Sequence, residues 1–286
     1  MFYLIDKPIQ MTSFDVIRKL RKILNIKKIG HSGTLDPLAT GCLLIATGNS
    51  TKLIPELENT YKRYTFRVRL DGKTDSLDLG TEVIPMDTKN IQEKTAEELK
   101  IFLENQKTQI PPKYSALHVH GKRAYDLVRQ GIEFEIQERN IHIKDVKILD
   151  FSLPDTISIS LTISSGGYIR SLAPTISSFF GLESGYISEL RRTHIFLDRG
   201  HYLEESMCTD IENPTPIPYD ILFPHIPTIS IEEPVYLDLK NGKEIFLQNK
   251  HSALAGGMKV FLKYGDIFLS LCLFDGEKFT VLRNNV

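Results

Sequence analysis

Residues 28–53 read KIGHSGTLDPLATGCLLIATGNSTKL. The first half of this stretch is interrupted by Gly30, Gly33 and Gly41, and glycine permits close backbone approach and unusual dihedral angles. The second half contains an apolar run that is typical of a buried strand. No Gly-Lys-Ser/Thr closes the loop, so it is not a P-loop, and it is not a dinucleotide fingerprint. The stretch therefore predicts a glycine-rich loop that leads into a core strand.

Asp36 lies inside this loop, directly before Pro37. The proline ring pushes the backbone of the residue before it toward an extended conformation. An isolated Asp-Pro is most often part of a turn. The loop alone therefore leaves two interpretations of Asp36 open, a turn residue or a catalytic carboxylate.

The composition is ordinary for a globular protein, since 41% of the 286 residues are hydrophobic and 25% are charged. The apolar run at the N-terminus is too short for a signal peptide, and no apolar stretch is long enough to span a bilayer. We therefore expect a cytoplasmic protein with no membrane partner. Cys42, Cys208 and Cys272 are far apart and odd in number, which predicts neither a disulfide framework nor a metal site.

Positive charge is concentrated in the first quarter of the chain, although the net charge is only −1. Residues 1–70 contain 12 Lys and Arg against 5 Asp and Glu, an excess of seven positive charges, and the remainder carries an excess of eight negative charges. Such a segment suits a polyanion, but it is equally compatible with a solvated basic surface. The charge distribution leaves both interpretations open.

The first predicted helix follows Thr12, whose spacing to Asp15 is typical of a capping box. Apolar residues then recur at helical spacing, and we expect them on the buried face. They are Phe14, Ile17, Leu20 and Leu24. The cations fall mainly on the opposite, polar side, and they are Arg18, Lys19, Arg21 and Lys22.

Two segments alternate as half-buried strands do, residues 61–70 and 157–163. In the first, Tyr64 lies on the apolar face, opposite a row of arginines. Further helices are predicted at 95–104, at 122–130 and from about residue 171, where Pro174 would fall in the tolerated first turn. Short strands are predicted near the C-terminus, at 260–262, 267–274 and 279–282.

The chain reads as an α+β protein with one large and one small part. We expect the large domain at 1–212. Six of the 14 prolines lie between 214 and 234, which indicates a connector at 213–234. A small β-rich domain is expected at 235–286.

The 28–53 stretch resembles the signature of the TruB-type tRNA pseudouridine-55 synthases, and other segments resemble the family in the same order, together covering about residues 3–196. These segments are Lys7-Pro8 with Thr12-Ser13, Lys62-Arg63-Tyr64, 114–117 with 121–125 and 129–131, 167–171, and Leu190-Arg191-Arg192. The resemblance implies the pseudouridine synthase fold, a central mixed or antiparallel sheet with flanking helices. It makes residues 1–212 the catalytic domain, with an insertion at about 85–135. The C-terminal part resembles the family's RNA-binding PUA-like domain only loosely.

The resemblance implies three catalytic residues. Asp36 corresponds to the family's catalytic aspartate, and attack on C1′, addition to C6 and removal of a ribose proton all remain open for it. Arg170 corresponds to the arginine that pairs with this aspartate; a cation at a helix start also favours an anionic partner on physical grounds. Tyr64 corresponds to the tyrosine that stacks on the uracil and helps remove the C5 proton, although its alternation alone indicates a core residue.

Other residues match positions that contact RNA in the family. His31 matches a histidine near the flipped nucleotides, and Tyr168 and Leu190 match residues that line the uracil pocket. Lys7 matches a lysine near the site, which we expect to meet phosphate. The cations expected to contact phosphate are Arg18, Lys19, Arg21, Lys22, Lys27 and Lys28.

The resemblance as a whole implies an enzyme that isomerises uridine 55 in the T-arm of tRNA after flipping the base. It implies no cofactor and no metal, and we expect a monomer. Two alternatives stay open. The chain could modify another RNA target, or it could be a tRNA-binding folding factor whose catalysis is secondary.

Overall fold

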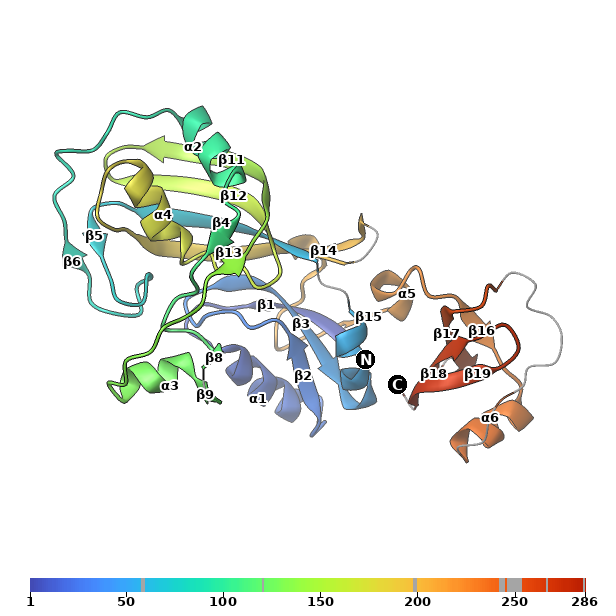
Figure 1. The fold of residues 1–286 in the computed structure, drawn as a ribbon. Coiled ribbons are helices and arrows are strands. Elements are labelled where there is room, and N and C mark those ends of the chain that lie inside the picture. The colour runs from blue at the N-terminus through green and yellow to red at the C-terminus, as the bar shows by residue number, and fades with distance from the viewer. Residues whose placement is uncertain are drawn as a thin grey trace.

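The largest sheet of the protein is mixed and runs through its larger lobe (Figure 1). The computed structural model describes residues 1–57, 60–119, 121–197, 200–241, 245, 254–265, 267–284 and 286. The strand order is β11–β12–β4–β13–β3–β1–β15, with β14 beside β13 and β2 beside β3. Its strands are β1 (Phe2–Lys7), β2 (Ile29–Ser32), β3 (Thr40–Thr47), β4 (Tyr61–Arg69), β11 (Ile143–Ser152), β12 (Thr156–Ser164), β13 (Tyr186–Phe196), β14 (Tyr202–Glu204) and β15 (Pro216–Ile217). Only β13 and β3 pair in parallel within the described part of this sheet. The predicted α+β class with a mixed sheet is confirmed.

Strands β1 and β3 are buried on both faces, which explains their continuous apolar sequences. Along β3, Leu43 and Ile45 join one hydrophobic core, whereas Leu44 and Ala46 join a second core on the other face. Successive side chains of a strand point to opposite faces, so an uninterrupted apolar run is stable only where both faces are covered.

Strand β4 is half-buried, as its alternation predicts. Tyr64, Phe66 and Val68 are buried in the first core. On the other face, Arg63 pairs with Asp145 at 3.2 Å in β11, two strands away across β12. The cationic face of this strand therefore has acidic and polar partners within the sheet as well as contact with solvent.

Helix α1 (Ser13–Ile23) starts at the predicted capping box, in which the Asp15 amide donates to the Thr12 hydroxyl at 3.0 Å. The expectation that Phe14 lies on its buried face is wrong. Phe14 is 53% exposed, because Val16 and Ile17 occupy that face instead. The guanidinium groups of Arg18 and Arg21 lie 5.6 and 5.7 Å from the Phe14 ring centroid.

The remaining predicted helices form close to their expected bounds. Helix α2 (Ala96–Glu104) has its own capping box, and α4 (Leu172–Phe179) begins after Ser171, which leaves Pro174 in the first turn. Helix α3 (Ala124–Arg129) starts two residues later than predicted, because β9 (Lys122–Arg123) pairs with β8 (His118–Val119). The other short strands before β11 are β5 (Gly72–Lys73), β6 (Ile84–Pro85), β7 (Thr108–Gln109) and β10 (Arg139–Asn140).

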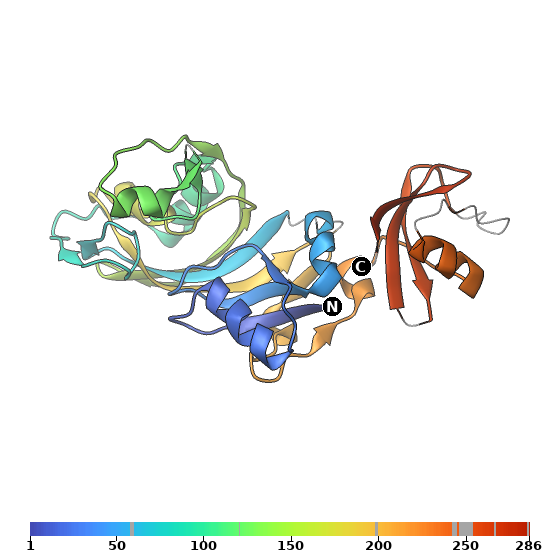
Figure 2. The same cartoon turned by 90° about the horizontal axis from the view of Figure 1, so that it is seen from below.

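A second sheet, β16–β17–β18–β19, forms a β-rich C-terminal region at the end of the molecule opposite β5 and β6 (Figures 1 and 2). Its elements are β16 (Thr228–Ser230), β17 (Met258–Tyr264), β18 (Ile267–Phe274), β19 (Phe279–Asn284) and helix α6 (Glu233–Lys240). Phe261 packs edge-on against Phe223 with ring centroids 5.4 Å apart, which joins this sheet to the second core. The predicted β-rich C-terminal region is confirmed.

The predicted connector, 213–234, is divided between the two sheets. Strand β15 pairs with β1, the short helix α5 (Tyr219–Leu222) follows it, and β16 is the edge strand of the C-terminal sheet. The domain boundaries drawn from the sequence stay a prediction.

In the described part of the chain, no helix combines the length and hydropathy needed to cross a membrane.

Candidate active site

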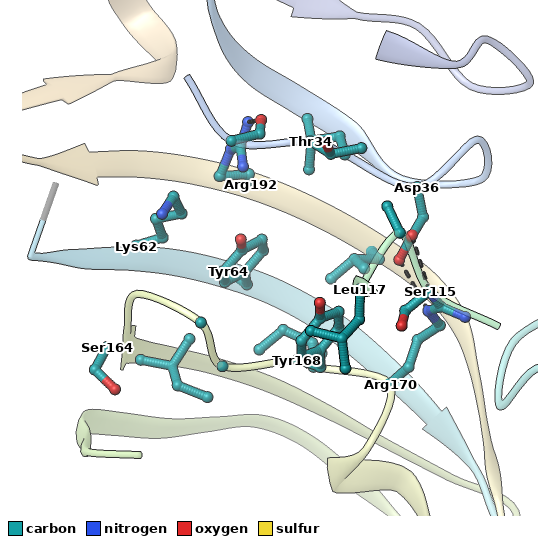
Figure 3. A pocket seen from close by; sticks show the side chains of 18 of the residues that line it. Thr34, Asp36, Lys62, Tyr64, Ser115, Leu117, Ser164, Tyr168, Arg170 and Arg192 are labelled. Carbon is teal, nitrogen blue, oxygen red and sulfur yellow. Dashed lines mark hydrogen bonds and ion pairs between the residues drawn. The ribbon is translucent and has the colours of Figure 1, made fainter. Parts of the chain in front are cut away.

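A pocket of about 460 Å³ lies where the β2–β3 loop meets β4, β13, the segment between β12 and α4, and the segment around β8 (Figure 3). Its lining includes all three residues that are predicted to be catalytic and both residues that are predicted to line the uracil pocket. These five residues are Asp36, Tyr64, Arg170, Tyr168 and Leu190. Segments far apart in sequence therefore converge on one cavity.

The loop that carries Asp36 is clamped to the start of α1. The Ser13 hydroxyl accepts a hydrogen bond from the Leu35 amide at 2.9 Å and donates to the Leu35 carbonyl at 3.2 Å. Ser13 and Leu35 are both buried, so this pair of bonds is shielded from water. The clamp fixes the backbone immediately before Asp36, whose side chain remains 32% exposed.

Arg170 binds the Asp36 carboxylate through two parallel hydrogen bonds. Its Nε donates to Oδ2 and its Nη2 to Oδ1, both at 2.9 Å. The guanidinium is only 4% exposed and also donates to the carbonyls of Ser76 at 3.0 Å and Tyr114 at 2.9 Å. A fork held at four acceptors cannot rotate freely, so it sets the orientation of the carboxylate.

The two tyrosines contribute aromatic surface to the pocket. Tyr64 projects from β4 and is 8% exposed. Tyr168 lies in the segment after β12, where its amide donates to Gln109 Oε1 at 2.6 Å and its carbonyl accepts from Gln109 Nε2 at 3.0 Å. Leu190 on β13 adds an apolar contact. Rigid aromatic and aliphatic walls of this kind suit a planar base.

Three charged residues in or beside the pocket were missed as individual site residues. Lys62 and Arg192 line the pocket, and Asp78 Oδ2 lies 3.6 Å from Arg170 Nε. A signal for the first two was present, because strand residues two apart share a face. Once Tyr64 and Leu190 are placed in the pocket, alternation puts Lys62 and Arg192 beside them. Asp78 lies in a loop, where no such periodicity applies.

Lys7 does not meet phosphate, and the prediction of such a contact is wrong. It is buried and does not line the pocket. Its ammonium group donates to three carbonyls, those of Pro8, Met11 and Pro37 at 2.9, 2.6 and 3.2 Å, so no N–H is left for a phosphate. Burial lowers the pKa of Lys7 to about 8, an effect that the Asp36 charge opposes. Through the bond to Pro37, Lys7 ties the Asp36 loop to the end of β1.

His31 lies on strand β2 rather than in a flexible loop, and it does not line the pocket. It is half-buried, its Nδ1 has no hydrogen-bond partner among the described residues, and burial followed by the Arg192 charge lowers its pKa. Its predicted contact with flipped nucleotides stays a prediction. The cations Arg18, Lys19, Arg21, Lys22, Lys27 and Lys28 are exposed and lie outside the pocket.

Gly41 lies in β3 directly beside the backbone of Arg192 in β13, with which it pairs. Its φ is +98°, and an added Cβ would overlap the carbonyl oxygen of Arg192. We expect Gly41→Ala to lower the free energy of unfolding by more than about 3 kcal/mol, because strained backbone and a backbone clash add. Gly48→Ala is the matched control: its φ is also positive, at +57°, but a Cβ there meets nothing within 4 Å. Urea unfolding compares the two, and equal losses would contradict the clash.

Sequence comparison identifies relatives of the chain. Residues 21–169 match the family described as TruB family pseudouridylate synthase, N terminal domain. The tRNA pseudouridine synthase B of Caulobacter vibrioides is 31% identical over 98% of this chain and 94% of its own length. The tRNA pseudouridine synthase B of Syntrophomonas wolfei is 35% identical over 85% of this chain and 84% of its own length.

Comparison with solved structures supports the fold. A chain of a Cbf5–Nop10–Gar1 complex superposes with a TM-score of 0.63 at 20% identity, covering 99% of this chain and 84% of that one. At this identity the similarity shows the fold alone, that is, the arrangement of the sheet and its flanking helices. The family is shown by the match over residues 21–169 and by the relatives that align along most of their length: this chain belongs to the TruB family of pseudouridylate synthases.

Proposed function

We propose that this enzyme isomerises uridine 55 in the T-arm of tRNA to pseudouridine, with Asp36 as the catalytic carboxylate. The observation that carries the proposal is the Asp36–Arg170 pair at the wall of a pocket that Tyr64 also lines. Relatives named tRNA pseudouridine synthase B support the choice of tRNA as the substrate.

The reaction cleaves the N1–C1′ bond of the nucleotide, turns the uracil and joins C5 to C1′. An ionised carboxylate can serve as nucleophile or base in such a sequence. Arg170 orients Asp36, and Tyr64 supplies an aromatic face for the uracil and a hydroxyl for the C5 proton. Tyr168 and Leu190 complete the walls of the pocket around the base.

A paired base inside the T-arm cannot reach a pocket of this kind, so the nucleotide must be extruded, at a cost of a few kcal/mol. We assign the stabilisation of the extruded state to His31. We assign the positioning of the RNA to the exposed cations of α1, Arg18, Lys19, Arg21 and Lys22, because phosphate contacts fix the register of a nucleic acid. The enzyme acts as a monomer in the cytoplasm.

Site-specific mapping of pseudouridine tests the proposal. An unmodified tRNA transcript is incubated with the protein, and pseudouridine is located at nucleotide resolution. We expect one product, at position 55. The matched control is the same transcript with cytidine at that position, which should acquire none. Modification at another uridine would refute the assigned target, and an unmodified transcript would refute the activity.

Replacing Tyr64 with phenylalanine separates stacking from proton transfer. Tyr64→Phe keeps the ring, so we expect RNA affinity to be retained while the single-turnover rate falls roughly 10²–10⁴-fold, the usual worth of a general acid or base. Tyr168→Phe is the matched control, because it removes a hydroxyl from another pocket-lining tyrosine. Its rate should stay within a few-fold of wild type. An unchanged rate in Tyr64→Phe would remove the proton-transfer role.

A further inference from the structure

The pocket has two differently charged ends (Figure 3). At one end the Asp36 carboxylate and the Arg170 guanidinium neutralise each other. Lys62 and Arg192 line the other end, in the left part of the view, with Tyr64 between Lys62 and Asp36. Among the described residues, no carboxylate lies within 4.0 Å of either cation. This end of the pocket therefore carries uncompensated positive charge.

Arg192 is a fixed donor. It is completely buried, its Nε donates to the Cys42 carbonyl at 2.7 Å, and its Nη2 donates to the Gly33 carbonyl at 3.1 Å. In the part of the chain that the structure describes, Nη1 has no hydrogen-bond acceptor. Removing a guanidinium from water is energetically costly, so a buried one is normally paired with an anion.

Lys62 faces the same space. Its ammonium group has one protein partner among the described residues, the hydroxyl of Ser165 at 3.2 Å. Burial, and then the Arg192 charge, lowers the pKa of Lys62 to about 8. Two like charges held together in a partly desolvated site are unfavourable until an anion lies between them.

Gly33 keeps the space between the two cations open. A Cβ at this position would lie 3.3 Å from Lys62 Cε and 3.6 Å from Arg192 Nη1. The φ of Gly33 is +82°, a conformation that side chains rarely adopt, so the loop itself requires glycine here. The result is a gap lined by an ammonium group and a free guanidinium nitrogen.

We propose that Lys62 and Arg192 bind one of the two phosphate groups that flank the extruded uridine. This inference rests on the proposed function. Lysine and arginine side chains that no carboxylate neutralises are typical hydrogen-bond donors to phosphate. The phosphate lies at the cationic end, the uracil lies against Tyr64, and the ribose is directed toward Asp36. The pair thus makes the pocket selective for a nucleotide within a chain over a free nucleoside.

A double-mutant cycle that combines a change of Lys62 with a change of an RNA phosphate tests this contact. Affinity is measured for T-arm stem-loops with native phosphates, or with one uncharged methylphosphonate either 5′ or 3′ of the target uridine. Lys62→Gln should weaken binding of native RNA roughly ten- to hundredfold, the range for a hydrogen bond to a charged group. At one of the two flanks, the methylphosphonate should weaken RNA binding by wild type to a similar extent. The same methylphosphonate should not weaken binding by Lys62→Gln any further. Additive losses at both flanks would overturn the proposal.

Two further variants make the result specific. Lys62→Arg retains the charge and should retain the coupling, which a purely structural role for the lysine would not require. Lys89→Gln removes an exposed lysine outside the pocket lining and should show no coupling to either flank. Pseudouridine formation by wild type on the native stem-loop is measured in parallel. Product together with additive losses refutes the phosphate site alone, whereas absence of product refutes the proposed function.

Discussion

Asp36→Asn is expected to lower the single-turnover rate of pseudouridine formation by at least about a thousandfold, or about 4 kcal/mol of transition-state stabilisation. Asparagine keeps the size of the side chain but lacks the charge and the nucleophilic or basic oxygen. One of the two hydrogen bonds from Arg170 also loses its acceptor when the amide nitrogen faces the guanidinium. Rapid-quench kinetics with excess enzyme give the rate of the chemical step directly.

The same variant distinguishes catalysis from tRNA folding. We expect Asp36→Asn to bind the T-arm within a few-fold of wild type, because the carboxylate acts on the reacting atoms and not on the phosphates. Asp150→Asn, which neutralises an exposed carboxylate on β11 outside the pocket lining, is the control and should keep full activity. A wild-type rate in Asp36→Asn would exclude the catalytic role. If the variant still supported growth and tRNA folding, RNA binding would be the main role.

Arg170→Lys is expected to reduce the single-turnover rate about a hundredfold, while RNA affinity stays within a few-fold of wild type. A lysine has one nitrogen in place of the fork, so it cannot hold both Asp36 oxygens and the carbonyls of Ser76 and Tyr114. A small displacement of a catalytic group costs about this factor. Acceptors left without donors should also reduce the free energy of unfolding by roughly 1–3 kcal/mol, which leaves the protein folded.

Arg191→Lys provides a closely matched control. Arg191 also holds an aspartate through two hydrogen bonds, to Asp6 at 3.0 and 2.8 Å, but this pair is outside the pocket and its guanidinium is 34% exposed. The control should lose little activity, because solvent-exposed ion pairs contribute little and this one does not touch the reacting aspartate. A near-normal single-turnover rate in Arg170→Lys would refute the positioning role of Arg170. An equal loss in both variants would show that the effect is not specific to the site.

Much of the secondary structure could be predicted because its causes are local. The capping box at Thr12 places the start of α1, and the alternation around Tyr64 places β4 with the correct face inward. Phe14 shows where such rules fail. Phe14 is apolar and lies at helical spacing from the other apolar residues of α1. Whether Phe14 or Val16 lies on the buried face depends, however, on which side of α1 the sheet covers.

The candidate site was only partly accessible from the sequence. Asp36 and Arg170 are 134 residues apart, and no local pattern links them; the family resemblance supplied the pair, and the fold brings it to 2.9 Å. Lys7 was assigned to phosphate because it matches a family lysine near the site, whereas the structure buries it against three carbonyls. Burial of a charged group depends on what surrounds it in space, which its neighbours in sequence do not specify.

Local sequence was thus sufficient for the glycine-rich loop, the core strand after it, the capped helices and the alternating strands, because hydrogen-bonding capacity and side-chain periodicity act over a few residues. Alternation also puts Lys62 and Arg192 on the face of the pocket, but tertiary structure alone decided that no carboxylate of the described residues pairs with them and that Asp6 pairs with Arg191. The physical reason is that desolvation and charge pairing depend on the distances between segments, and those distances exist only once the sheet has assembled.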